Sequence, residues 1–152
     1  MVNQRARIAL TQDEQRELLE HARVLQVASL NPDGTPHLVP MWFVFDDDGA
    51  LAFTTYGRAQ KIRNLERDAR LTVLAEAGDA YGELRGVSID GTAELVRDPR
   101  RTARVLQLVG AKYAGRPRPD ADPAAEPPAA AYKRVTVIVQ PRRVRTWDHR
   151  KL

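Results

Sequence analysis

The chain of 152 residues is 43% hydrophobic and 29% charged, a composition typical of one soluble globular domain, and we expect a single domain over residues 1–152. It contains no cysteine, which excludes disulfide bonds, thiolate zinc sites and a cysteine nucleophile. The sequence has no apolar run long enough to span a membrane and begins with a polar, charged segment, so it predicts a cytoplasmic protein.

The net charge is +4, and only four of the 24 basic residues are lysines. Arginine has a planar guanidinium that suits phosphate and carboxylate groups, so an anionic ligand is one explanation of this excess. The other explanation of the arginine excess is the codon usage of a GC-rich genome.

The first half of the chain reads as one helix followed by a series of strands. Thr11 opens the capping-box pattern Thr-Gln-Asp-Glu and predicts a helix over 12–22. Residues 24–30 read as a strand that ends in an Asn-Pro-Asp-Gly turn. A second strand is predicted over 35–45, and an Asp-Asp-Asp-Gly tip leads from it into a third strand over 50–55.

The middle of the chain returns to β-structure after a short helix. A Tyr-Gly-Arg break follows the third strand, and the apolar spacing over 59–67 predicts a helix. A strand is predicted over 71–77 and a long alternating strand over 83–96, with Gly86 and Gly91 at bulges or sharp bends.

The last third contains a helix, a loop and the final strands. An Asp-Pro pair opens a helix over 99–113. Residues 116–130 are rich in proline and alanine without a core pattern, and we expect a mobile loop there. A strand is predicted over 131–140, and Pro141 permits one last strand through Trp147. Six or seven hairpin-linked strands with three short helices favour an antiparallel barrel over a βαβ fold.

The sequence lacks the motifs of the common nucleotide and metal sites. There is no Gly-x-Gly-x-x-Gly after a strand and no Gly-x-x-x-x-Gly-Lys-Ser/Thr loop. The three histidines lack the spacing of metal ligands and are interpreted as surface or structural residues: His21, His37 and His149. We therefore predict no catalytic side chain and no metal site, and expect a cofactor to supply the reactive group.

One segment, 53–65, has the chemistry of a phosphate site. A strand ends in the hydroxyl residues Thr54 and Thr55, a glycine turn follows, and a helix begins with Arg58 and Lys61 near its start. Cations at a helix N-terminus oppose the helix macrodipole unless an anion binds there. The alternative, from the residues alone, is an ordinary exposed helix start.

The order of these features resembles the pyridoxamine 5'-phosphate oxidase-like split β-barrel superfamily, and most closely its actinobacterial branch of F420-dependent oxidoreductases. The resemblance rests on the early strand pair (A-S-L-N-P-D-G-T-P-H-L-V-P-M-W-F), then F-T-T, K-I-R-N-L-E-R-D, G-T-A-E and the strand 143–147. It covers about residues 10–148, and the segment 116–130 departs from it.

The resemblance implies a mainly β (α+β) split antiparallel barrel that forms a homodimer with two cofactor sites at the interface. The cofactor ring is expected against the second strand, its phosphate at the start of the helix over 59–67, and a C-terminal strand of the other subunit over the ring. The cofactor-binding residues predicted in this way are Val39, Pro40, Met41, Trp42, Thr54, Thr55, Arg58, Gln60, Lys61, Asn64, Arg145 and Trp147. For the two tryptophans, packing in the barrel core or the dimer is the alternative.

Coenzyme F420 and FMN share the tricyclic ring and the ribityl phosphate, so this site does not separate them. F420 carries an additional anionic tail, and Arg58, Arg63, Arg67 and Arg70 would extend a basic groove for it. The favoured function is F420-dependent hydride transfer to an unidentified small-molecule substrate. The alternatives are an FMN-dependent oxidoreductase and a non-catalytic flavin or deazaflavin carrier. With few aromatic residues among the basic ones, we expect no nucleic-acid partner, and no membrane partner either.

Overall fold

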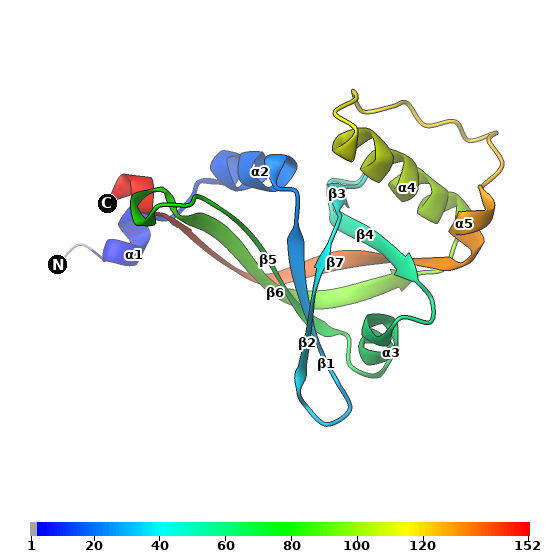
Figure 1. The fold of residues 1–152 in the computed structure, drawn as a ribbon, viewed down its shortest axis with the longest axis horizontal. Coiled ribbons are helices and arrows are strands. Elements are labelled where there is room, and N and C mark those ends of the chain that lie inside the picture. Colours follow the sequence, from blue (N-terminus) through cyan, green and yellow to red (C-terminus); the bar gives the residue numbers. More distant parts are fainter. Residues whose placement is uncertain (1–2) are drawn as a thin grey trace.

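The computed structural model describes residues 3–152, which form one seven-stranded antiparallel sheet with short helices around it (Figure 1). The strands are β1 (Leu25–Leu30), β2 (Pro36–Met41), β3 (Val44–Phe45), β4 (Leu51–Tyr56), β5 (Arg70–Ala77), β6 (Arg85–Val96) and β7 (Arg134–Asp148). The helices of this part of the chain are α1 (Gln4–Arg7), α2 (Gln12–His21), α3 (Gln60–Arg67), α4 (Pro99–Tyr113) and α5 (Ala129–Tyr132), with the 3-10 turns η1 (Tyr81–Glu83) and η2 (His149–Lys151). None of the helices within 3–152 is both long and apolar enough to cross a membrane.

The order of the strands requires the sheet to curl. The order is β2-β1-β5-β6-β7-β4-β3, so β2 and β3 lie at opposite edges although only Trp42 and Phe43 separate them in sequence. Seven flat strands would place the edges about 29 Å apart, at about 4.8 Å between neighbours. The link from Met41 to Val44 spans at most about 11 Å. The sheet therefore bends into the half-barrel seen in Figure 1, and the predicted mainly β, split antiparallel barrel is confirmed.

The main core lies inside the curl. Leu25 of β1, Phe53 of β4 and Ile62 of α3 are fully buried there. Helix α2 adds Leu18 and Leu19 to the same cluster. Helices α2 and α3 thus cover the concave face of the sheet and position the residues that line it.

Helix α4 packs on the other face. Its Val105 and Leu108 join Ala52 of β4 and Ile138 of β7 in a second apolar cluster. Neighbouring residues of a strand point to opposite faces, and Phe53 belongs to the main core. Helix α4 therefore covers the convex face of β4 and β7, as Figure 1 shows.

The strand predicted over 35–45 is wrong in its middle, because Trp42 and Phe43 separate β2 from β3. The backbone N–H of Phe43 donates to the hydroxyl of Tyr113 at 3.1 Å instead of to a neighbouring strand. Tyr113 lies at the end of α4, so a residue 70 positions away interrupts the strand.

The two strands predicted at the C-terminus are one continuous strand, β7, and the residues 129–132 before it form α5. Pro141 lies in the strand without breaking it, because it sits beside a bulge: Pro141 pairs with Gly91, Arg143 pairs with Asp90, and Arg142 is the extra residue between them. The bulge predicted at Gly91 is confirmed. Gly86 instead lies in regular register opposite Trp147, and a Cβ on it would come within 2.3 Å of the indole.

Hydrogen bonds join the segment 116–130 to α4 and to the end of β3. Arg100 of α4 donates to the carbonyl of Pro123 at 3.1 Å, and Arg118 donates to the carbonyl of Phe45 at 2.9 Å. Its mobility stays a prediction.

Candidate functional site

Lys61 and Thr55 meet where β4 passes into α3. The Lys61 Nζ donates to the Thr55 hydroxyl at 3.1 Å. Thr55 is only 5% exposed, and burial lowers the pKa of the half-buried Lys61, because desolvation disfavours the ammonium. An ammonium held by a neutral hydroxyl in a partly dry site gains from an anion beside it.

The start of α3 would also be stabilised by a bound anion. Ala59 is its N-cap residue, and within the part of the chain that the structure describes no side chain caps this end and no acidic residue lies in its first turn. The first turn carries Lys61, which opposes the helix macrodipole. A phosphate would accept from the N-terminal amides and pair with the ammonium. The structure thus brings Thr55 and Lys61 together at the first turn of α3, which begins at Gln60, and the binding of an anion there stays a prediction.

Asn64 connects the start of α3 with the end of β1 below this site. It is fully buried, and its Nδ2 donates to the Ser29 hydroxyl at 3.1 Å and to Asn31 Oδ1 at 3.0 Å. Its Oδ1 accepts from Gln60 Nε2 at 3.0 Å and, at 3.4 Å, from Arg67. Both amide hydrogens are therefore used inside the protein. Asn64 holds α3 against the end of β1, and its direct contact with a cofactor stays a prediction.

His37 supplies a polar atom without a partner. It lies opposite Ser29 in the β1–β2 register, and directly opposed residues of an antiparallel pair share a face. Its Nδ1 is buried and has no hydrogen-bond partner among the described residues. Buried polar atoms are nearly always satisfied, so this nitrogen fits a site that accepts a ligand.

Strand β2 presents only alternate residues to this face. Val39 and Met41 lie opposite Val27 and Leu25 of the main core, so they point to the concave face together with His37. Pro40 points to the convex face. The side chains of Val39 and Met41 therefore lie on the same face of the sheet as Thr55, the partner of Lys61, and Pro40 lies on the opposite face.

Trp42 stands at the end of β2, 58% exposed. Its ring stacks on Tyr113 of α4, with centroids 4.3 Å apart and planes 10° from parallel. Offset stacking of this kind orients an aromatic surface. Trp42 is thus packed on α4 and is not a residue of the barrel core.

Thr54 lies on the opposite face of β4 from Thr55. Its hydroxyl accepts from Arg134 at 3.3 Å, and Arg134 also covers the ring of Tyr56, 4.4 Å from the centroid. The structure does not bring Thr54 to Lys61, so the phosphate contact of Thr54 stays a prediction without support in the geometry of one chain.

The arginines expected to form a basic groove divide into two pairs. Arg67 donates to the carbonyl of Leu30, and Arg70 pairs with Asp68 at 2.6 Å, so both are held within the protein. Arg58 and Arg63 are exposed beside α3.

Comparison with known proteins identifies the family. The family model for pyridoxamine 5'-phosphate oxidase matches residues 11–148. The chain belongs to this family. The match covers the strands of the half-barrel and the segment that carries Thr55 and Lys61, so the resemblance found in the sequence is confirmed.

Solved structures of the pyridoxamine 5'-phosphate oxidase fold agree with this assignment. A conserved hypothetical protein from Mycobacterium tuberculosis is 39% identical, with 99% of this chain and 92% of that chain covered and a TM-score of 0.86. A protein named F420 reductase is 30% identical, with 85% and 94% covered and a TM-score of 0.65. A FAD-binding protein from Mesorhizobium loti is 19% identical, with 91% and 94% covered and a TM-score of 0.67, and this likeness shows the fold alone. No curated protein matches the sequence.

Arg145 and Trp147 lie far along β7 from the Lys61 site. Thr54 pairs with Thr136, and Trp147 follows 11 residues later, roughly 35 Å of strand at about 3.3 Å per residue. Arg145 forms a bidentate pair with Asp90 at 2.6 and 2.7 Å. Within one chain these residues do not join the site, and their contribution from a partner subunit, as expected for this family, stays a prediction.

Three residues of the site were not predicted from the sequence: Ser29, Asn31 and His37. A signal for Ser29 was present, because it occupies an inward position of the alternating strand β1, where the other inward residues are Leu25 and Val27. A hydroxyl at such a position needs a partner. Asn31 and His37 carry no comparable signal.

Proposed function

We propose that this member of the pyridoxamine 5'-phosphate oxidase family is an oxidoreductase that uses coenzyme F420 to reduce a conjugated small molecule. The contact between Lys61 and Thr55 at the uncapped start of α3 carries the proposal, because it offers a cation, a hydroxyl and helix amides to one phosphate. The 30% identity to a protein named F420 reductase supports the choice of cofactor.

The residues present fit such a cofactor. Lys61, Thr55 and the first turn of α3 would hold its phosphate, and Val39 and Met41 give the concave face an apolar surface for its ring. The buried Nδ1 of His37 offers a further polar atom. When bound, the deazaflavin supplies the hydride chemistry, while the side chains orient it and exclude water.

The chemistry is tested by turnover. Protein mixed with reduced F420 and a panel of quinones and nitroaromatics should restore the fluorescence of oxidised F420 with at least one acceptor. The same mixture without an acceptor is the control. Tight binding without turnover of any acceptor would support the non-catalytic carrier instead.

FMN is the second candidate, and one observation favours it. Two of the four arginines expected along the F420 tail, Arg67 and Arg70, are engaged within the protein. The phosphate site itself suits both cofactors, so the tail decides between them.

We expect a homodimer in solution. The residues predicted to cover the ring, Arg145 and Trp147, lie far from Lys61 in one chain, and Leu38 is 64% exposed on the convex face of β2. Multi-angle light scattering should give twice the chain mass at micromolar concentration. A monomer that still binds cofactor with full affinity would contradict a site completed by two chains.

The exposed arginines should make F420 binding depend on salt. Each exposed contact with the anionic tail contributes about 0.2–1 kcal/mol, so replacing Arg58 and Arg63 together by glutamine should weaken F420 binding about twofold to thirtyfold at low salt. FMN has no tail and is the matched control ligand. Titrations at low and high salt give the comparison. An equal loss for both ligands would mean that the tail does not run along these residues.

A further inference from the structure

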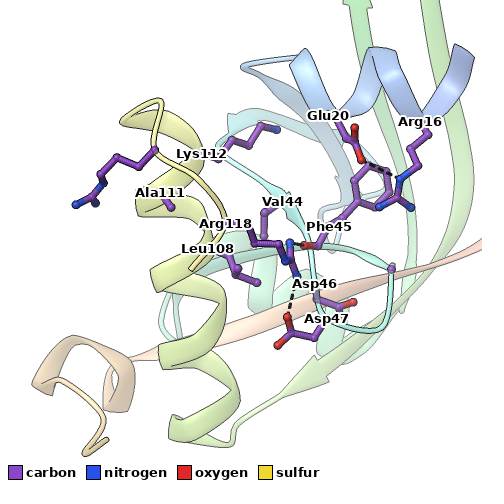
Figure 2. A pocket seen from close by; sticks show the side chains of 12 residues that line it. Arg16, Glu20, Val44, Phe45, Asp46, Asp47, Leu108, Ala111, Lys112 and Arg118 are labelled. Carbon is purple, nitrogen blue, oxygen red and sulfur yellow. Dashed lines mark hydrogen bonds and ion pairs between the residues drawn. The ribbon is translucent and has the colours of Figure 1, made fainter. Parts of the chain in front are cut away.

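A cavity separate from the Lys61 site lies between α2, β3 and the end of α4 (Figure 2). Its volume is about 430 Å³. Val44, Phe45, Leu108 and Ala111 give it an apolar wall, and charged side chains surround this wall. A cavity of this size and lining suits a small molecule with an apolar body and one polar group.

Lys112 is the more buried of the two cations of this cavity, Lys112 and Arg116, that have donor capacity to spare. Its Nζ donates to the carbonyl of Phe43 at 3.2 Å and to the carbonyl of Leu19 at 3.4 Å, and it lies 3.7 Å from the centroid of the Phe43 ring. An ammonium has three N–H groups, so these two bonds, which tie α4 to α2 and to the link before β3, leave one. No carboxylate among residues 3–152 lies within 4.0 Å of it, and burial lowers the pKa of Lys112 to about 8.

Arg116 also lines the cavity, is exposed, and has no carboxylate within 4.0 Å among residues 3–152. Most of the other charges around the cavity are neutralised. Arg16 pairs with Glu20 at 2.8 Å, and its guanidinium covers the ring of Phe45. Arg118 pairs with Asp47 at 2.7 Å, as Figure 2 shows. Asp46 also lines the cavity, and its Oδ1 accepts from two backbone amides of its own hairpin.

We propose that this cavity binds a small aromatic carboxylate, with the carboxylate on the third N–H of Lys112 and the ring against Phe45, Val44 and Leu108. The carboxylate compensates the charge of the desolvated ammonium, and the flat apolar ring packs against the apolar wall between α2 and α4. The structural bonds of Lys112 are retained, so the ligand adds to them and replaces none. The inference does not depend on the proposed function, because none of the residues that line this cavity belongs to the Lys61 site.

Benzoate is the probe, and benzamide, which has the same shape without the charge, is the control ligand. Benzoate titrated into isotopically labelled protein should shift the backbone amide signals of Leu108, Ala111 and Lys112. Lys112→Gln should weaken benzoate binding about tenfold or more, the loss expected for one charge-assisted hydrogen bond, and leave benzamide unchanged. Lys133→Gln, which removes an exposed charge at the end of α5, should bind benzoate as the wild type does.

A second variant covers the case in which Lys112→Gln does not fold. Ala111→Leu keeps Lys112 and fills part of the cavity, so it should abolish benzoate binding while the circular dichroism spectrum is retained. Benzoate that binds Lys112→Gln or Ala111→Leu with wild-type affinity would overturn the proposal. Absence of benzoate binding at millimolar concentration, or shifts that cluster on α3, would overturn it as well.

Discussion

Replacing Lys61 by alanine weakens the binding of coenzyme F420 by roughly 10- to 150-fold, which corresponds to about 1.5–3 kcal/mol for a lost charge-assisted hydrogen bond. The effect is large because Lys61 is the cation in the first turn of α3 and its ammonium is already held in place by Thr55. Preorganisation of this kind spares the ligand the entropy of ordering a long side chain. Fluorescence titration of the purified protein gives the dissociation constant.

The fold should survive this change, because Lys61 is half-buried and its ammonium donates to a single hydroxyl, that of Thr55. Lys61→Gln keeps a donor without the charge and should lose nearly as much affinity. Arg101→Ala, an exposed cation on α4, is the matched control and should bind as the wild type does. Wild-type affinity in Lys61→Ala would place the phosphate elsewhere in the chain.

Replacing Gly91 by alanine lowers the free energy of unfolding by about 3 kcal/mol, the upper part of the range for overpacking a close contact. A Cβ at this position would lie 2.2 Å from the carbonyl oxygen of Gln140, which is backbone and cannot rotate away. Gly91 is also paired on its other side with Leu71 of β5, so the strand has little room to shift. Urea denaturation followed by circular dichroism measures the change, and the melting temperature should fall by about 6–12 °C.

Gly82→Ala is the control for this substitution. Nothing lies within 4 Å of a Cβ at Gly82, so alanine there should change the stability little. Equal stability of the Gly91 and Gly82 variants would mean that β6 and β7 can move apart at the bulge.

Local signals in the sequence predicted most of the elements. The capping box at Thr11 is present, with the Thr11 hydroxyl accepting from the Glu14 amide at 3.2 Å and Glu14 accepting from the Thr11 amide at 2.7 Å. The elements that were predicted wrongly depend on residues distant in the sequence. The break after Met41 is stabilised by the hydroxyl of Tyr113, and the bulge at Arg142, which follows Pro141 in β7, is defined by the pairing with β6. Neither partner is visible in the local pattern.

The residues of the candidate site also divide into those that local sequence predicted and those that depend on the folded structure. Thr55 and Lys61 are close in sequence and were predicted together, because a strand end and the next helix start are neighbours in any fold. Thr54 was grouped with them, yet the alternation of a strand sends its side chain to the other face. His37 could not be predicted, since only the pairing of β1 with β2 places it opposite Ser29.

The most direct test of the proposed function is titration of cofactor-free protein with coenzyme F420 and, separately, with FMN. The Lys61 site at the start of α3 and the exposed Arg58 and Arg63 beside it favour the ligand that carries both a phosphate and an anionic tail. We predict that F420 binds one molecule per chain and more tightly than FMN at low salt, with the difference shrinking as salt rises. Tighter binding of FMN, or no binding of either cofactor, would contradict the proposal.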